Sequence, residues 1–433
     1  MAATGMISNQ IHIHPNQRFE PSSEEYNKYN YYNSNGKTVP SNNARNTFAP
    51  SKSTLSPLSL PKMKIEQSLP VSPPQTPKPP SGCNKKQLTV SARHLENYNL
   101  HSTFASKYCI GEELGSGGFG FVISAIQKST RREVAVKFIF REKVPAHAWA
   151  NDTDLGMIPM EIYVLKNVKH PSIIAFLDAY QDARFFYLVM ELHGTQWSAA
   201  NPLLVSPEAR LSKLAAVTDQ QQNGSGMASL GPPTPPEEPN FPPIDENGQP
   251  RPNLLVRRTS CDLFECIEHH SKFSENLSKK IFRQIIECVS YLNDIGVCHR
   301  DIKDENIVID NNYVVKLVDF GSAVILPRSN AIKPHYFDKF YGTISFASPE
   351  ILLCKPYCAE PAEIWSLGIL LYTVLTGEVP FNDPQQAISG PYAPPRVNCT
   401  QACLDLLERM LEKNPEKRAT VAEVMDHPWF REN

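Results

Sequence analysis

Proline is concentrated in two stretches of this chain, and that distribution decides where a packed fold can form. Residues 1–105 and 195–260 together hold 23 of the 38 prolines in the 433-residue sequence. Proline interrupts regular helices and strands, and neither stretch shows a hydrophobic period of 3.6 or 2.0 residues. Such segments bury too little apolar surface to offset the entropy of ordering. We therefore predict a disordered, mildly basic tail at 1–105 and a disordered, proline-rich insert at 195–260.

The remaining residues, 108–194 joined to 261–430, have the pattern of one folded unit that the insert interrupts. Apolar alternation between turn residues predicts β-strands within 108–127, 132–140 and 184–192. Apolar spacing of three and four residues predicts helices at 158–168, 275–296 and 363–377. Because the strands come early and the helices late, we expect an α+β fold with a small strand-rich lobe and a larger helical lobe.

Charge and cysteine usage exclude several classes of protein. A net charge of -2 with 20% charged residues argues against nucleic-acid binding. The ten cysteines form no C-x-x-C pair, and the closest are Cys354 with Cys358 and Cys399 with Cys403, so we expect reduced, mostly buried thiols. No segment has the signal pattern of a secreted protein or the ~20 apolar residues of a membrane span. We therefore expect a monomer of the cytoplasm or nucleus.

The stretch "LGSGGFGFV" has the spacing G-x-G-x-x-G-x-V, formed by Gly115, Gly117 and Gly120 and closed by Val122. Glycines without Cβ atoms allow a hairpin backbone to approach phosphates with its N–H groups. Alone, the pattern fits a hairpin turn with no ligand equally well. A dinucleotide-binding fold would require a helix directly afterwards, whereas this sequence continues as a strand.

A lysine and a glutamate follow this loop at positions suited to a nucleotide. Lys137 ends the strand pattern "VAVK", where a lone lysine would ordinarily be a solvated strand end. Glu161 lies on the next predicted helix and could hold the Lys137 ammonium against nucleotide phosphates.

In "HRDIKDEN", residues 299–306, six of eight residues can carry a charge, yet apolar residues flank them. Buried charges need partners, which a substrate or a metal can provide. Asp301 would accept a proton from an attacking hydroxyl, Lys303 would neutralise a transferring phosphoryl group, and Asn306 would bind Mg²⁺ through its oxygen. Asp319 in "KLVDFG" could bridge the metal to the phosphates, although alone it would be an ordinary turn aspartate.

Taken in order, "GSGGFG", "VAVK", "HRDIKDEN", "DFG" and "SPE" resemble a eukaryotic-type protein kinase over the entire folded unit. The resemblance implies a two-lobed kinase domain at 108–430, with a small lobe at about 108–190, a hinge at 191–194, a large lobe at about 261–430, and the cofactors ATP and Mg²⁺. It implies an adenine site formed by Leu114, Val122, Ala135, Met190, Glu191, His193 and Val308. It also implies that His299 packs against Phe320 and Leu165; we assign no role to Asp304.

Lys303 and "YGTISFASPE" resemble serine/threonine kinases, in which Thr343 would lie close to Asp301 and Lys303. The segments "FFYLVMELHGT", "DLFECIE" and "DFGSAVIL" are similar to PAS-domain-regulated kinases and more distantly to Pim kinases. Residues 1–105 are too short and too polar for a PAS module. The family implies signalling linked to nutrient or metabolic state.

Two departures from the general kinase pattern matter. Glu363 stands where most kinases have the aspartate that holds the catalytic loop, although PAS kinases share this glutamate. Asp338 lies near the position of an activating phosphothreonine in many kinases, and its carboxylate could partly replace that phosphate in pairing with Arg300. We therefore expect activity without phosphorylation of the activation segment.

Two acids match positions that bind an arginine three residues before the phosphorylated residue in basophilic kinases. These are Glu305 and Asp262, which would equally serve as solvated surface acids. "RRTS" would place Ser260 in such a site, so autophosphorylation of Ser260 is a hypothesis. Proline-directed kinases could act at Ser-Pro and Thr-Pro positions, although proline-rich composition explains these equally well: Ser56, Ser72, Thr76, Ser206 and Thr234.

We thus expect a serine/threonine kinase that transfers the γ-phosphoryl group of MgATP to proteins. The main alternative is a scaffold that acts through its disordered segments, but pseudokinases usually lose the lysine or aspartates that Lys137, Asp301 and Asp319 represent. A small-molecule phosphotransferase is disfavoured by "SPE" and by Arg418, which would pair with Glu350 and brace a peptide-binding segment.

Overall fold

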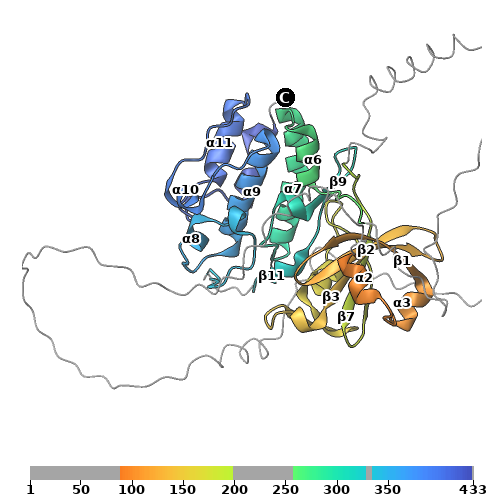
Figure 1. The fold of residues 1–433 in the computed structure, drawn as a ribbon. Helices are drawn as coiled ribbons and strands as arrows, with labels where there is room; N and C mark the ends of the chain where they lie inside the picture. The colour runs from red at the N-terminus through yellow and green to blue at the C-terminus, as the bar shows by residue number, and fades with distance from the viewer. Residues whose placement is uncertain (1–87, 198–256, 328–333, 432–433) are drawn as a thin grey trace, which may run out of the picture. The chain divides into compact units, whose positions relative to one another are not determined.

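The structure is a computed structural model that describes residues 88–197, 257–327 and 334–431 (Figure 1). The disorder predicted for 1–87 and for 198–256, and the five Ser-Pro and Thr-Pro positions, lie outside the described residues. No helix in these described ranges is both long enough and apolar enough to cross a membrane.

The small lobe contains a five-stranded antiparallel sheet with the order β1-β2-β3-β7-β6. Val, Ile and Phe predominate in the central strands, where β-branched and aromatic side chains pack well on a pleated surface. The sheet confirms the predicted strands, and its members are β1 (Tyr108–Ser116), β2 (Gly120–Gln127), β3 (Glu133–Phe140), β6 (Phe176–Gln181) and β7 (Phe185–Glu191).

Two short helices precede this sheet and pack against it, as Figure 1 shows: α2 (Val90–Leu95) and α3 (Ser102–Lys107). Leu95 and Phe104 are buried in the same cluster as the aromatic residues of β2, β3 and β7. The predicted tail therefore extended too far, because residues 88–105 contribute to the fold. Helices of six residues are too short to reveal a helical period in the sequence.

A hairpin and a helix lie between β3 and β6. The hairpin strands are β4 (Trp149–Asp152) and β5 (Gly156–Pro159), and they lead into α4 (Met160–Asn167). Lys166 of α4 donates to Asp152 of β4 at 2.7 Å, which fixes the helix to the hairpin. The predicted helix at 158–168 is thus confirmed, whereas the hairpin was not predicted.

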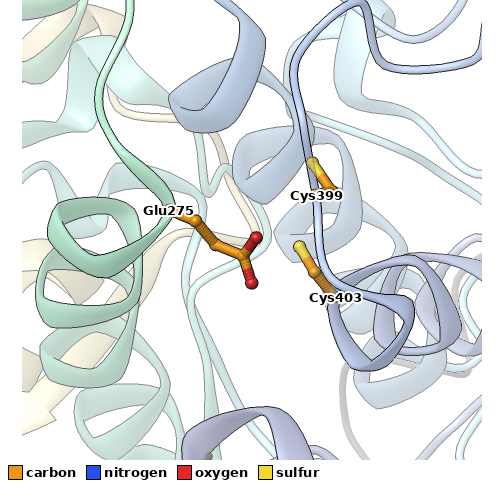
Figure 2. Close-up of side chains that lie close together, drawn as sticks. All are labelled: Glu275, Cys399 and Cys403. Carbon is orange, nitrogen blue, oxygen red and sulfur yellow. The ribbon is translucent and has the colours of Figure 1, made fainter. Parts of the chain in front are cut away.

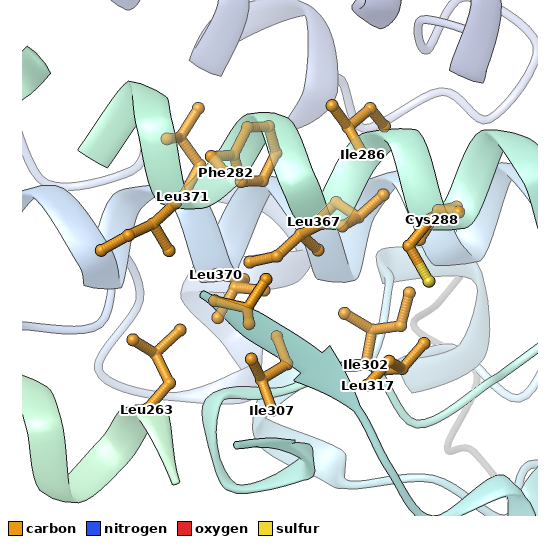
Figure 3. Close-up of a cluster of buried hydrophobic side chains, with 14 of the residues drawn as sticks. Leu263, Phe282, Ile286, Cys288, Ile302, Ile307, Leu317, Leu367, Leu370 and Leu371 are labelled. Atoms are coloured by element: carbon orange, nitrogen blue, oxygen red, sulfur yellow. The ribbon is translucent and has the colours of Figure 1, made fainter. Parts of the chain in front are cut away.

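The large lobe is built on two long helices, α7 (Glu275–Asp294) and α9 (Ala359–Thr376), which contact each other. Figure 3 shows buried side chains of both helices, such as Phe282 and Leu370, beside Ile307 and Leu317. Removing a fully buried Leu or Phe side chain from water is worth about 1.5–3 kcal/mol, so this cluster fixes the loops attached to it. The helices predicted at 275–296 and 363–377 are confirmed.

The other elements of the large lobe are short. The helices are α6 (Leu263–His270), α8 (Pro349–Leu352), α10 (Pro384–Ser389), α11 (Gln401–Met410) and α12 (Val421–Met425). The strand pairs are β8 (Val297–Cys298) with β11 (Val324–Ile325), and β9 (Ile307–Ile309) with β10 (Val315–Leu317). The 3₁₀ turns are η1 (Arg141–Lys143), η3 (Asp304–Asn306), η4 (Phe320–Ser322), η5 (Ile344–Phe346) and η6 (Pro428–Phe430).

Both ends of the predicted insert are part of the fold. Thr195 donates its backbone N–H to the Ile309 carbonyl at 3.0 Å, and Trp197 is buried beside His270. At the other end, Arg258 donates its backbone N–H to the Glu113 carbonyl at 2.9 Å. Polar composition concealed these anchors because each consists of only three or four residues. The predicted boundaries at 195 and 260 were therefore too wide.

Candidate active site

One lysine joins three elements of the structure. Lys137 of β3 donates to Glu161 of α4 at 2.7 Å and to Asp319, at the start of η4, at 2.9 Å. Only 13% of the Lys137 side chain is exposed, whereas 48% of the Asp319 side chain is, so the free carboxylate oxygen of Asp319 can face a ligand. The predicted pairing of Lys137 with Glu161 is confirmed.

Burial and neighbouring charges shift the pKa values of Lys137 and Asp319 in opposite directions. Burial alone would lower the pKa of Lys137, but the carboxylates of Asp319 and Glu161 outweigh it and hold the pKa above its ordinary value. Burial would raise the pKa of Asp319, but the Lys137 ammonium outweighs it and lowers that pKa. Lys137 is therefore a fixed cation and Asp319 a fixed anion at neutral pH.

The carboxylate of Asp301 is held by two neighbours. The Thr343 backbone N–H and hydroxyl both donate to Oδ1 at 2.8 Å, and the Asn306 amide donates to Oδ2 at 2.9 Å. Lys303 lies 3.9 Å from Oδ2 and pairs more closely with Glu305 at 2.7 Å. Thr343 thus lies at Asp301 as predicted, and Asn306 keeps its carbonyl oxygen available for a metal.

Buried contacts fix the backbone on either side of Asp301. His299 is fully buried, contacts the Phe320 ring edge-on at 4.7 Å between centroids, and lies within hydrogen-bond reach of the Val318 carbonyl at 2.9 Å. Arg300 donates its backbone N–H to the Glu363 carboxylate at 2.9 Å. Glu363 therefore reaches the catalytic loop, as its replacement of the usual aspartate requires.

The expected pairing of Arg300 with Asp338 is wrong. The Arg300 guanidinium donates to the Lys339 carbonyl at 2.9 Å and to the Tyr357 hydroxyl at 2.7 Å, and it lies over the Phe337 ring at 4.6 Å. Asp338 is exposed, and among the described residues the hydrogen bonds of the Arg300 guanidinium go to Lys339 and Tyr357 and not to Asp338. Tyr357 and Phe337 were missed because aromatic residues, unlike the neighbouring Asp338, carry no charge that marks them as partners of a cation.

The glycine-rich loop connects β1 to β2 and leaves space beside two of its glycines. A Cβ atom added at Gly115 or Gly117 would meet nothing within 4 Å, so a phosphate chain would fit against the backbone there. At Gly120 a Cβ atom would lie 2.0 Å from the Phe138 carbonyl oxygen. Gly120 is therefore required by close packing against β3, which differs from the phosphate contact expected of it.

The predicted adenine site brings residues of β1, β2, β3, β7 and β9 into one hydrophobic cluster. Ala135 lies opposite Met190 in the register of β3 and β7, and both are buried. Leu114, Val122 and Val308 are partly buried against the same cluster. The predicted adenine-site residues of both lobes thus belong to one apolar cluster.

The side chains of the predicted hinge residues make contacts within the protein that the sequence did not indicate. The Glu191 carboxylate accepts from the Ala175 N–H at 2.8 Å and pairs with Lys316 at 2.9 Å. The His193 ring lies 2.9 Å from the Val314 carbonyl. The Glu191 and His193 side chains thus brace the hinge against Ala175, Lys316 and Val314.

Three carboxylates gather where α6 begins beside η3. Asp262 caps α6 by accepting from the Glu265 N–H at 2.8 Å, and Glu305 is 57% exposed. Burial, and then the nearby Glu305 charge, raise the pKa of Asp304 to about 6 and also raise the pKa of Asp262. The three carboxylates therefore have too little positive charge near them to balance their own. An arginine side chain could supply it. Asp304, which had no predicted role, belongs to it.

A separate group of possible metal ligands lies away from this site, and Figure 2 shows Glu275 facing Cys399 and Cys403. Both Glu275 oxygens already accept hydrogen bonds, from Thr400 at 2.6 and 2.8 Å and from Trp429 at 2.7 Å. Burial raises the pKa of both thiols, which keeps them protonated. Glu275 thus ties α7 to α11 and η6. The nine described cysteines are free thiols, and four of them are buried.

Residues 108–212 and 253–430 match the family model described as the protein kinase domain. The chain belongs to the protein kinase family. This assignment agrees with the sheet of the small lobe, the helices of the large lobe and the Lys137–Glu161 pair.

Several curated protein kinases are similar to this chain. The mouse PAS domain-containing serine/threonine-protein kinase is 35% identical over 323 residues, which cover 75% of this chain and 18% of that protein. Serine/threonine-protein kinase ppk6 of Schizosaccharomyces pombe is 30% identical over 75% of this chain and 33% of its own length. PSK1 of Saccharomyces cerevisiae is 29% identical over 74% of this chain and 19% of its own length. This protein kinase thus matches between about a fifth and a third of each relative.

Proposed function

We propose that this chain is a serine/threonine protein kinase that uses MgATP. The observation that carries the proposal is the Asp301 carboxylate, which Thr343 and Asn306 hold at 2.8 and 2.9 Å beside the Lys137–Glu161–Asp319 triad. A positioned base and a positioned cation are the two parts that phosphoryl transfer demands of a protein. All of the residues required for this chemistry are present.

Each of these residues would have its own role in phosphoryl transfer. Bound MgATP supplies the phosphoryl group and a divalent charge that neutralises its oxygens. Lys137 would bind phosphate oxygens, and Asp319 and the Asn306 carbonyl oxygen would hold the metal. Asp301 orients a serine or threonine hydroxyl and accepts its proton, and Lys303 stabilises the charge that develops nearby.

We further propose that substrates carry an arginine three residues before the phosphorylated residue. Glu305 is exposed, and Asp262 lies close enough for the Glu305 charge to raise its pKa. A guanidinium between these acids would relieve their mutual repulsion and form charge-assisted hydrogen bonds. From the resemblance to PAS-domain-regulated kinases we propose a role in signalling, with nutrient or metabolic state as its input and the cytoplasm or nucleus as its location.

A positional-scanning peptide phosphorylation assay tests activity, residue class and arginine preference together. We expect ³²P transfer from ATP to serine and threonine peptides, with selection for arginine at position -3. Lys137→Met and Asp301→Asn serve as controls for contaminating kinases. Equal signal from the wild type and both variants would contradict the proposal and favour the alternative of a scaffold built on a kinase fold.

A further inference from the structure

The segment 257–262 contacts the small lobe before it enters α6 of the large lobe. The Arg258 guanidinium pairs with Glu112 of β1 at 2.6 Å and with Glu133 of β3. Its backbone N–H donates to the Glu113 carbonyl at 2.9 Å, so main chain and side chain hold the same strand. Only 24% of the Arg258 side chain is exposed, so water and salt screen these pairs less than fully exposed ones.

The other end of this segment is fixed to the large lobe. The Cys261 carbonyl accepts from the Ile309 N–H of β9 at 2.9 Å, and Asp262 is the N-cap of α6. A chain of four residues spans at most about 14 Å, so Arg258 and Asp262 join the lobes by a short path.

This second connection runs beside the hinge. A Cβ atom added at Gly194 would lie 2.5 Å from the Cβ of Cys261, and Gly194 has a φ of +104°. The hinge and the segment 257–262 therefore touch, and the pairs of Arg258 with Glu112 and Glu133 fasten this second connection to the small lobe.

One hydroxyl lies within the segment where added charge would disturb both ends. Ser260 donates its hydroxyl to the Asp262 carboxylate. A phosphate carries about -1.5 to -2 charges at neutral pH and, as a dianion, has no proton to donate. A phosphate on Ser260 would repel Asp262 and compete with Glu112 and Glu133 for Arg258, two residues away.

We propose that residues 257–262 form a strap that limits separation of the lobes, and that phosphorylation of Ser260 releases it. In that step the Ser260 oxygen forms a bond to the γ-phosphorus of MgATP, the bond to the ADP oxygen breaks, and the hydroxyl proton leaves to solvent. A serine kinase that binds Arg257, which is exposed three residues before Ser260, is the catalyst. The proposal rests on the proposed function only in that the strap borders a nucleotide-binding cleft.

Hydrogen–deuterium exchange of the β1 amides, measured without nucleotide, tests the strap independently of kinase activity. Arg258→Ala should raise β1 exchange about threefold to tenfold, the effect of losing two partly exposed ion pairs. Arg257→Ala, a truncation of the exposed neighbour, is the matched control and should leave exchange unchanged. Combining Arg258→Glu with Glu112→Arg and Glu133→Arg should restore slow exchange, which separates loss of the strap from general unfolding.

The release is tested with full-length protein that carries phosphoserine at position 260, introduced during synthesis. We expect its β1 exchange to match Arg258→Ala and its release of a fluorescent ATP analogue to quicken by a similar factor, whereas Ser260→Ala should match the wild type. Equal exchange in Arg258→Ala and Arg257→Ala would overturn the strap. Unchanged exchange in the phosphorylated protein would overturn its release. Failure of the analogue to bind, with the exchange results as expected, would refute the proposed function alone.

Discussion

The Glu363 carboxylate lies 2.9 Å from the backbone nitrogen of Arg300, and both residues are buried. Arg300 has a φ of +67°, a conformation that costs about 1–3 kcal/mol for a residue with a side chain. The hydrogen bond from its N–H to Glu363 stabilises that conformation next to Asp301. An acid on α9 thus fixes the backbone of the catalytic loop.

The pH dependence of stability should reveal this acid. Burial raises the pKa of Glu363 to about 7 from an ordinary 4.5. The folded protein binds the Glu363 proton more tightly than the unfolded chain does, because the pKa is higher in the folded state. Protonation therefore stabilises the fold below pH 4.5, and this stabilisation is lost as the pH rises to 7. Glu363→Gln should therefore reduce the fall in the free energy of unfolding between pH 4.5 and 7.5 by on the order of 2 kcal/mol. Urea unfolding at several pH values measures this, with the exposed Glu416→Gln as control. Identical pH slopes in all three proteins would contradict the prediction.

The buried Glu350–Arg418 pair should show the opposite dependence on pH. Arg418 donates to both Glu350 oxygens at 2.8 and 2.9 Å, and it outweighs burial to lower the pKa of Glu350. The stabilisation is therefore present above pH 4.5 and lost as the pH falls below it. Glu350→Gln should cost about 3–5 kcal/mol at pH 7 and less at pH 4. Chemical unfolding tests this, with the exposed Glu416→Gln expected to be neutral.

Asp301→Asn should lower the phosphorylation rate about 10²- to 10⁴-fold, the usual range for a general base. An asparagine oxygen can still accept from Thr343, so the fold and nucleotide affinity should persist. Steady-state kinetics with thermal unfolding checks both expectations. Asp294→Asn, an exposed acid at the end of α7, is the control. Near-normal turnover in Asp301→Asn would refute the role of Asp301.

Protein made in bacteria and treated with phosphatase should phosphorylate a peptide, because Arg300 is already anchored by neutral groups. Tyr357→Phe removes the hydroxyl that Arg300 bonds at 2.7 Å and should lower turnover about tenfold. Asp338→Asn should leave turnover within about twofold, because Asp338 is exposed and does not pair with Arg300 in the described segment. A dephosphorylated enzyme without activity would contradict the first expectation.

Glu305→Gln should raise KM about tenfold for a peptide with arginine at position -3, and little for the same peptide with alanine there. Glu305 is exposed and pairs with Lys303 at 2.7 Å, so an effect on kcat for both peptides would instead indicate a role through Lys303. The exposed Glu268→Gln on the adjacent α6 is the matched control. Equal KM ratios for the two peptides in wild type and variant would refute the assignment.

Local sequence patterns predicted which helices and strands form better than they predicted where these elements begin and end. The strand run that ends at Lys137 and the apolar spacing of α7 and α9 are long enough to carry their own period. By contrast, α2, α3 and the anchors at Trp197 and Arg258 are short and polar, and they are ordered only by the surfaces against which they lie.

The sequence alone determined the α+β kinase fold and the residues able to perform phosphoryl transfer, because these depend on motif order and hydrophobic period. Only the tertiary structure decided that Arg300 contacts Tyr357 and not Asp338, that Gly120 serves packing, and that Arg258 pairs with Glu112 and Glu133. The partners of a charge are chosen by which groups burial brings within about 4 Å, and separation along the chain does not encode that choice.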